Sequence, residues 1–96
     1  MKITAKILLL LSLALLTNAF AASPQEKSVV CEACHGKEGI SVINIYPNLA
    51  KQNAQYIEKQ LRAFRGGQRV DPIMSPMAKS LTDDDISVLA AYYSSL

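Results

Sequence analysis

The sequence predicts a small all-α domain with about three main helices. Three stretches, which begin at Ser23, Asn53 and Thr82, each combine a helix-capping residue with apolar residues at helical spacing. Few segments resemble strands, and the 96 residues contain no internal repeat, low-complexity tract or second domain. A domain of this size buries little apolar surface of its own, so we expect it to be marginally stable unless something adds to its core.

The first 21 residues (1–21) are predicted to be a cleaved signal peptide. Two lysines give a positive start, residues 7–16 are almost entirely apolar, and Ala19-Phe20-Ala21 supplies small residues at the two positions that a signal peptidase recognises. The apolar run is shorter than the ~20 residues of a membrane-spanning helix, so we expect no permanent membrane anchor. Residues 22–96 then form the mature domain, exported to the periplasm.

The charge balance argues against binding to nucleic acid. The formal net charge of +2 comes from Lys2 and Lys6 in the predicted signal, and without them eight Lys and Arg face eight Asp and Glu. A nucleic-acid-binding domain would need a concentrated basic face.

The first helix is predicted to begin at Ser23 and to end near Gly36. Ser23 can cap it, Pro24 suits its first position, and Glu26 completes a capping box. The helix carries a short apolar stripe made of Val29, Val30, Ala33 and Cys34.

This helix carries the pattern Cys-x-x-Cys-His, at Cys31, Cys34 and His35, which is typical of covalent haem attachment. Two thiols one short helical turn apart can add to the two vinyl groups on one edge of a porphyrin. The histidine that follows then lies under the ring, where a neutral imidazole nitrogen can bind iron. A haem is a large apolar plate, so one covalently bound haem c would also supply the missing core.

Three alternatives explain less of the pattern. A thioredoxin-like redox pair needs alternating strands and helices around it. A zinc site usually needs four ligands, and the chain has two cysteines and one histidine. A plain disulfide leaves His35 without a role.

Residues 40–52 are predicted to be a loop centred on Pro47-Asn48. The Pro47 carbonyl could accept the second ring N–H of His35 and so fix the imidazole, as partners of metal-bound histidines do. An ordinary surface turn explains the proline equally well.

A second helix is predicted from its cap at Asn53 to Gly66-Gly67. One face carries Tyr56, Ile57, Leu61 and Phe64, which we expect to pack in the core and against the haem. A mild basic cluster, made of Arg62, Arg65 and Arg69, is expected to be a solvated helix face. A salt bridge from Arg69 to a haem propionate is the alternative.

The segment from Asp71 to Ser80 is predicted to be a stiff, extended loop, because Pro72 and Pro76 flank Met74. Such a loop could point Met74 at the haem iron. Met77, nearer the last helix, is the second candidate, and ordinary core packing is the alternative for either methionine.

The last helix is predicted to begin after Thr82. Thr82 is the cap, Asp85 occupies the capping-box position, and Leu81 with Ile86 can form a hydrophobic staple. Its buried stripe is expected to comprise Ile86, Leu89, Ala90 and Tyr93.

Taken together, the chain resembles the class I cytochromes c, specifically the small bacterial monohaem type that is similar to one half of the dihaem cytochromes. The resemblance covers nearly all of residues 22–96. The matching stretches are Cys31 to Gly36 with Gly39, Pro47 to Ala50, Tyr56, Gln60 to Phe64, Gly67, Arg69, Met74, Leu81 to Ile86 and Ala90 to Tyr93.

The resemblance implies an all-helical fold around one haem, with His35 below the iron, a methionine sulfur above it and the Pro47 carbonyl bonded to His35. Similar chains place the methionine seven residues before the leucine that precedes the last helix cap, which favours Met74 over Met77. Two features depart from the family. Lys51 stands where glycine is common, and the first helix has a short lead-in that could reduce its contact with the last.

These observations predict a one-electron carrier that is not an enzyme, because two axial ligands from the protein leave no open position for a substrate. Its partners would be larger redox proteins of the respiratory chain or periplasmic dehydrogenases and oxidases. Two alternatives remain: a haem-based gas sensor or catalyst with a displaceable methionine, and a haem subunit of a larger redox enzyme.

Overall fold

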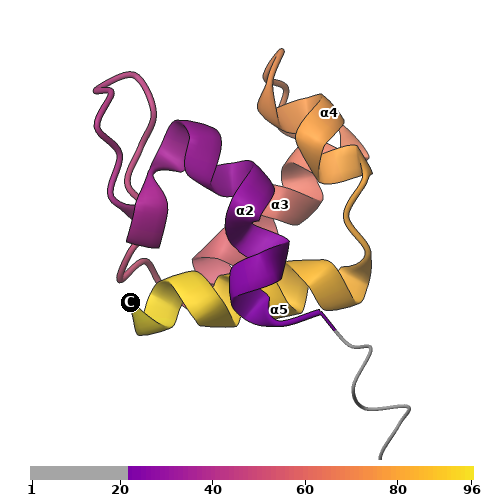
Figure 1. Ribbon diagram of the computed structural model, residues 1–96. Helices are drawn as coiled ribbons and strands as arrows, with labels where there is room; N and C mark the ends of the chain where they lie inside the picture. Colours follow the sequence, from indigo (N-terminus) through magenta and orange to yellow (C-terminus); the bar gives the residue numbers. More distant parts are fainter. Residues whose placement is uncertain (1–21) are drawn as a thin grey trace, which may run out of the picture.

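The structure, a computed structural model, describes residues 22–96 (Figure 1). The predicted signal peptide lies outside this range. The elements in chain order are α2 (Pro24–His35), the 3-10 turn η1 (Lys37–Gly39), α3 (Ala54–Gly66), α4 (Met74–Lys79) and α5 (Asp83–Ser95). This part of the chain contains no strand, so the predicted all-α class is confirmed.

Helix α2 begins and ends where the sequence predicts. The Ser23 hydroxyl accepts a hydrogen bond from the Glu26 N–H at 3.2 Å, and Pro24 occupies the first turn. The helix ends because Gly36 adopts φ 84°, where its N–H still reaches the Glu32 carbonyl at 2.9 Å. A side chain at Gly36 would place its Cβ 1.8 Å from the Ile40 carbonyl oxygen, so only glycine fits this turn.

Helix α3 also follows its predicted signals. The Asn53 side chain accepts from the Tyr56 N–H at 3.0 Å, and Gly67 ends the helix in the left-handed conformation. Ile57 and Phe64 are buried and Leu61 is half-buried, whereas Tyr56 is 49% exposed. The predicted apolar face is therefore correct except at its Tyr56 edge.

The prediction of an extended loop from Asp71 to Ser80 was wrong, because residues 74–79 form the short helix α4. The Asp71 carboxylate caps this helix by accepting from the Ile73 and Met74 N–H groups at 2.9 and 2.8 Å. Pro76 falls in the first turn, where backbone N–H groups have no partner within the helix, so the proline removes no hydrogen bond. Pro76 would break a helix at an interior position, but it is tolerated in the first turn of α4, and Pro72 precedes the helix.

Helix α5 begins with the complete predicted capping box. Thr82 Oγ1 accepts from the Asp85 N–H at 3.1 Å, and the Asp85 carboxylate accepts from the Thr82 N–H at 3.0 Å. The predicted stripe is confirmed, since Ile86, Leu89, Ala90 and Tyr93 are all at most 2% exposed.

The helices pack around α5, which crosses both α2 and α3, while α4 packs on α3 (Figure 1). A small buried cluster joins Ile57 of α3 to the stripe of α5. Despite its short lead-in, α2 is tied to α5 by the Lys27–Asp85 ion pair at 2.8 Å. Asp83 ties α5 to α3 by pairing with Arg62 at 3.0 Å and Arg65 at 2.6 Å.

At Lys51, where glycine is common in the family, the backbone adopts a conformation that favours glycine. Lys51 adopts φ 66°, in the left-handed region that favours glycine, and its N–H donates to the Tyr93 carbonyl at 3.0 Å. The long loop is thereby anchored to α5 through a strained residue. Among the residues that the structure describes, we find no helix long and apolar enough to cross a membrane.

Candidate haem site

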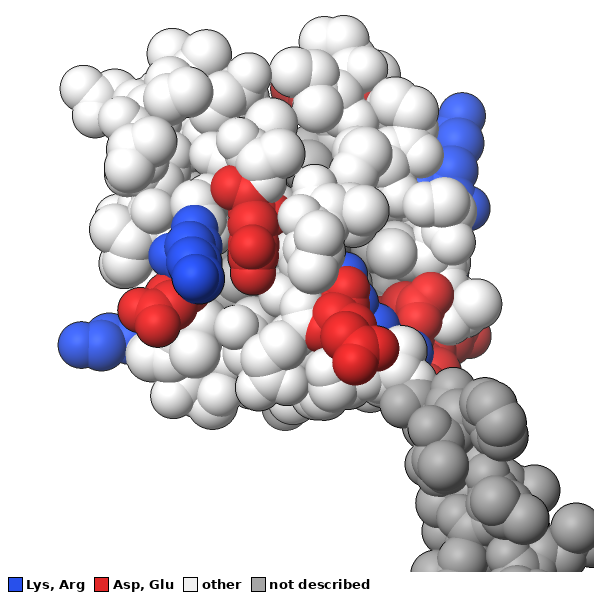
Figure 2. All heavy atoms as spheres, in the orientation of Figure 1, with Lys and Arg blue, Asp and Glu red and all other residues white. Residues whose placement is uncertain are grey.

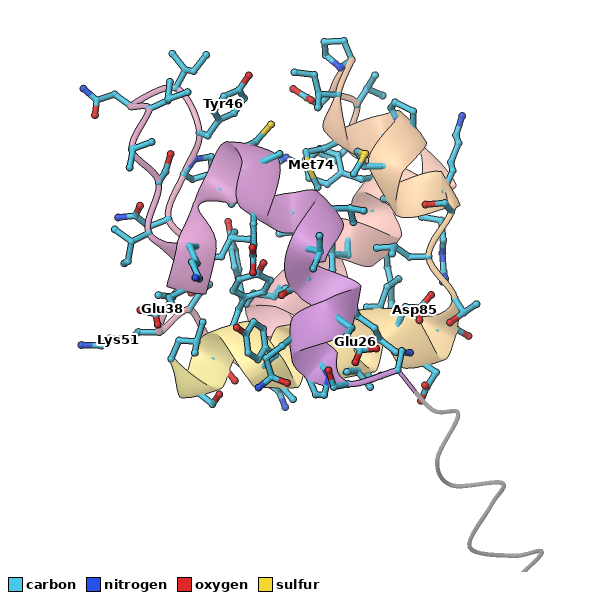
Figure 3. All side chains as sticks on the ribbon, viewed as in Figure 1. Glu26, Glu38, Tyr46, Lys51, Met74 and Asp85 are labelled. Atoms are coloured by element: carbon cyan, nitrogen blue, oxygen red, sulfur yellow. The ribbon has the colours of Figure 1, made fainter. Side chains whose placement is uncertain are left out.

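A cavity of about 450 Å³ lies between the helices. Its walls are mostly apolar and come from all four α-helices and the 47–52 loop. α2 contributes Cys31, Cys34 and His35, and α4 contributes Met74 and Met77. Met74 lies between α2 and α4 in Figure 3. The cavity therefore brings together every residue for which the sequence predicted a role in haem attachment or iron ligation.

The two cysteines lie one turn apart on α2 and line the same cavity. Both are free thiols and both are half-buried, so neither takes part in a disulfide with the other. Burial raises the pKa of the Cys31 thiol, which also lies beside Tyr93. Two cavity-facing thiols at this spacing can each add to a vinyl group of a porphyrin.

His35 is buried at the end of α2, and its orientation is fixed. Its Nδ1 lies 2.8 Å from the Pro47 carbonyl oxygen, so the bond predicted between these residues is present. A carbonyl only accepts hydrogen bonds, so Nδ1 is the donor, and in the neutral ring Nε2 then keeps its lone pair. This is the tautomer that a metal ligand requires.

The loop that holds Pro47 is tied back to α2 and η1 at several points. The Gly39 carbonyl accepts from the Leu49 and Ala50 N–H groups at 2.8 and 3.1 Å. Ser41 links the two ends: its hydroxyl lies 3.2 Å from the Cys34 carbonyl oxygen and 2.8 Å from the Ile43 carbonyl oxygen, and its N–H donates to the Asn48 side chain at 2.7 Å. These contacts fix Pro47 relative to His35.

Sequence reasoning missed two residues here. Ser41 was unassigned, and Tyr46 lies beside the histidine, with the two ring centres 6.5 Å apart in an edge-on arrangement. Figure 3 shows Tyr46 on the loop near the end of α2. Ser41 lies seven residues before Asn48, its hydrogen-bond partner, and this separation matches no helical or strand periodicity. The sequence alone therefore could not have revealed the contact.

Two methionines face the cavity from α4, three residues apart on one side of the helix. Met74 is half-buried at the first helical position, directly above the Asp71 cap, whereas Met77 is 37% exposed. α4 packs on α3, and its Ala78 is completely buried.

The predicted basic cluster divides into two parts. Arg62 and Arg65 are occupied by Asp83. Arg69 lines the cavity, with its guanidinium 4.5 Å above the Phe64 ring centre and a hydrogen bond to Gln60 at 2.8 Å.

The donor set fits a haem and does not suit zinc. Within residues 22–96, no three His, Cys, Asp or Glu side chains gather to hold a metal ion. A haem brings four nitrogens of its own and needs only axial ligands, an apolar pocket and two thiols. The cavity offers an oriented histidine, soft methionine sulfurs, apolar walls and both cysteines.

Fold and cavity together define a small, all-helical protein with a covalently attached c-type haem. The family model described as "Cytochrome c" matches residues 27–96. The chain belongs to the cytochrome c family, and as such it is an electron-transfer protein and not an enzyme.

Relatives of two lengths match the chain. Cytochrome c-554(548) of Halomonas halodenitrificans is 47% identical over 78 residues, which cover 78% of this chain and 94% of that protein. Cytochrome c4 of Pseudomonas aeruginosa is 38% identical over 96 residues, covering 98% of this chain but 48% of the relative. The thiosulfate dehydrogenase electron acceptor of Thiomonas intermedia is 43% identical, covering 81% of this chain and 36% of the relative.

Solved structures support the same assignment. Cytochrome c4 of Acidithiobacillus ferrooxidans superposes with a TM-score of 0.66 at 41% identity, covering 69% of this chain and 38% of that one. The chain thus spans one half or less of several relatives. This agrees with the predicted resemblance to one half of a longer cytochrome.

Proposed function

We propose that the chain is a periplasmic one-electron carrier. In this proposal Cys31 and Cys34 form the haem thioethers, and His35 and Met74 are the axial ligands. A haem bound in this way supplies an Fe(III)/Fe(II) couple, whose potential is raised by a methionine ligand.

The observation that carries the proposal is the hydrogen bond between His35 and Pro47. At 2.8 Å it holds Nδ1 protonated and leaves Nε2 free. The same cavity is lined by both cysteines and, from α4, by both methionines. The protein's own contribution is to hold these groups in place, so that little rearrangement accompanies a change of one electron.

The proposed location rests on the predicted signal peptide. The proposed partners are larger redox proteins of the same compartment, a suggestion supported by relatives named as electron acceptors of thiosulfate dehydrogenase.

The mixed surface charges fit a carrier that can dock on its partners in more than one orientation. Figure 2 shows Lys, Arg, Asp and Glu interspersed around α5 and the lower part of α2. Residues 39–50, beside His35, contain no charged residue. Contact near the cofactor therefore depends on apolar packing more than on charge.

Absorption spectra of the purified oxidised and reduced protein test the proposal. We expect the spectrum of a low-spin c-type haem, a weak red band of sulfur-bound ferric iron and no reaction of the reduced protein with carbon monoxide at neutral pH. Rapid carbon monoxide binding would instead favour the gas sensor or catalyst. Stable co-purification with a second subunit would favour the subunit of a larger enzyme.

A further inference from the structure

Tyr93 holds a buried polar atom whose bonding the fold leaves unexplained. Its side chain is 2% exposed, and within residues 22–96 its hydroxyl is the only buried side-chain polar atom without a hydrogen-bond partner. Native proteins rarely keep such a group, because a buried hydroxyl that has lost water and gained no partner is destabilising. A partner that forms only when the cofactor is attached would satisfy this hydroxyl.

Two polar groups of α2 lie beside this hydroxyl, the Cys31 thiol and the Ser28 hydroxyl. Cys31 packs against the buried cluster to which Tyr93 belongs. Ser28 is completely buried, and its single proton is directed to the Gln25 carbonyl at 2.8 Å. Ser28 can therefore act toward Tyr93 only as an acceptor, and the Cys31 sulfur is the competing acceptor.

The position of the Tyr93 hydroxyl indicates which neighbour, Cys31 or Ser28, could link it to a bound cofactor. Tyr93 and Cys31 both line the cavity, but the Tyr93 oxygen is buried away from the cavity space. A ring bound in the cavity would thus pack against the Tyr93 side chain without bonding its hydroxyl. The Cys31 sulfur is the atom that would touch both the cofactor and Tyr93.

We propose that Tyr93 is a positioning residue, whose hydroxyl donates a hydrogen bond to the Cys31 sulfur once that sulfur is part of the haem thioether. The inference rests on the proposed role of Cys31. On attachment the S–H adds across a vinyl double bond, so the sulfur loses its proton to the vinyl group and becomes an acceptor only. The Tyr93 hydroxyl must then be the donor.

Such a bond has two consequences. It fixes the direction of the first thioether by linking it to α5. It also withdraws electron density from a haem substituent, which favours the reduced state.

The test compares Tyr93→Phe with Tyr92→Phe, its half-buried neighbour on α5, whose ring lies 5.1 Å away. We expect Tyr93→Phe to lower both the Tm and the midpoint potential, and Tyr92→Phe to change neither. In the NMR spectrum of the reduced parent protein, a slowly exchanging Tyr93 hydroxyl proton should show an NOE to the Cys31 β protons. This measurement needs no variant to fold.

Two results would overturn the inference. One is a Tyr93→Phe protein with the parent's potential. The other is a Ser28→Ala protein that reproduces the whole loss of Tm at unchanged potential, because Ser28 is then the acceptor. The pyridine haemochrome spectrum and intact mass of every protein, taken first, separate these results from a failure of the proposed function, in which the parent itself lacks covalent haem.

Discussion

Met74 and Met77 lie on the same cavity wall, yet their surroundings differ. The prediction of Met74 relied partly on an extended loop, and that support is gone because both residues belong to α4. What remains is the spacing to Leu81 and the deeper burial of Met74. The less exposed of the two methionines is the one whose sulfur would be better shielded from solvent when bound to iron.

We expect Met74→Ala to abolish the weak red band of ferric haem, lower the potential and allow carbon monoxide to bind. Met77→Ala should keep the band and cost a modest amount of stability, about 1–2 kcal/mol for a partly exposed methionine. Absorption spectra and redox titration of both variants provide the measurement. The opposite pattern would assign the ligand to Met77.

Lys51 provides a second prediction at the level of single residues. The left-handed conformation costs a non-glycine residue about 1–2 kcal/mol, whereas glycine costs roughly 0.5–1 kcal/mol more in chain entropy. Because φ is 66° here, Lys51→Gly should raise the free energy of unfolding by about 0.5–1 kcal/mol. Denaturant unfolding of the holoprotein measures this.

Lys51→Ala is the matched control, because it removes the exposed amine but keeps the Cβ. It should give no gain. An equal gain in both variants would attribute the effect to the lysine charge.

At the level of elements, the start of α5 joins α2 and α3. Asp85 closes the capping box and pairs with Lys27 of α2, while Asp83 pairs with two arginines of α3. The hydrogen bond from Lys27, followed by that from the Thr82 N–H, lowers the pKa of Asp85 from 3.8 to about 2.

The lowered pKa of Asp85 determines in which direction stability changes with pH, and over which pH range. The folded state binds the Asp85 proton less tightly than the unfolded state, so the contribution is complete above pH 3.8 and is lost as the pH falls toward about 2. Asp85→Asn should therefore be less stable than the parent at neutral pH, and the two Tm values should converge near pH 2. Thermal unfolding across this range measures the convergence.

Asp84→Asn is the control for Asp85→Asn. The Asp84 side chain is 83% exposed and lies 3.7 Å from Lys27, so its replacement should cost little at any pH. A constant gap between Asp85→Asn and the parent down to pH 2 would show that the effect does not depend on the charge of Asp85.

The sequence predicted some helices better than others. α3 and α5 were predictable because each has a local cap and a buried stripe, both encoded within a few residues. The cap of α2 was equally local, but Val29 and Val30 of its predicted stripe are more than half exposed. α4 was not predictable, since its cap is Asp71, separated from the first helical residue by Pro72 and Ile73. In the site, the Cys-x-x-Cys-His pattern is local and was predictable, whereas the contacts of Tyr46 and Tyr93 depend on tertiary packing.

For the molecule as a whole, cofactor and core are one feature. Within residues 22–96, the buried apolar cluster consists of Ile57, Leu89, Ala90 and Tyr93, beside a cavity of about 450 Å³. Filling that space with a covalently held apolar ring would remove the lining side chains from water, as the interior of a larger domain does.

The chain should therefore need haem in order to fold. Replacing Cys31 and Cys34 by alanine should give a product that is degraded after export or lacks a cooperative unfolding transition by circular dichroism. Val29→Ala, at a position 59% exposed on the same helix, is the control and should remain folded. A cooperatively folded, haem-free monomer of the double variant would contradict this prediction.

The His35–Pro47 bond bears on the order in which the two sides of the pocket form during folding. It closes over a short stretch of chain, and most of its supports lie within residues 34–50, to which the Lys51 N–H adds one bond to the Tyr93 carbonyl of α5. The methionine wall needs α4 to dock on α3, far along the chain from His35. Local contacts form early and distant ones late, so the histidine side of the pocket should assemble first and open last. Hydrogen exchange on the holoprotein should show longer-lived amides at Leu49 and Ala50 than at Met74 and Met77, and the reverse ranking would mean that the pocket opens from the histidine side.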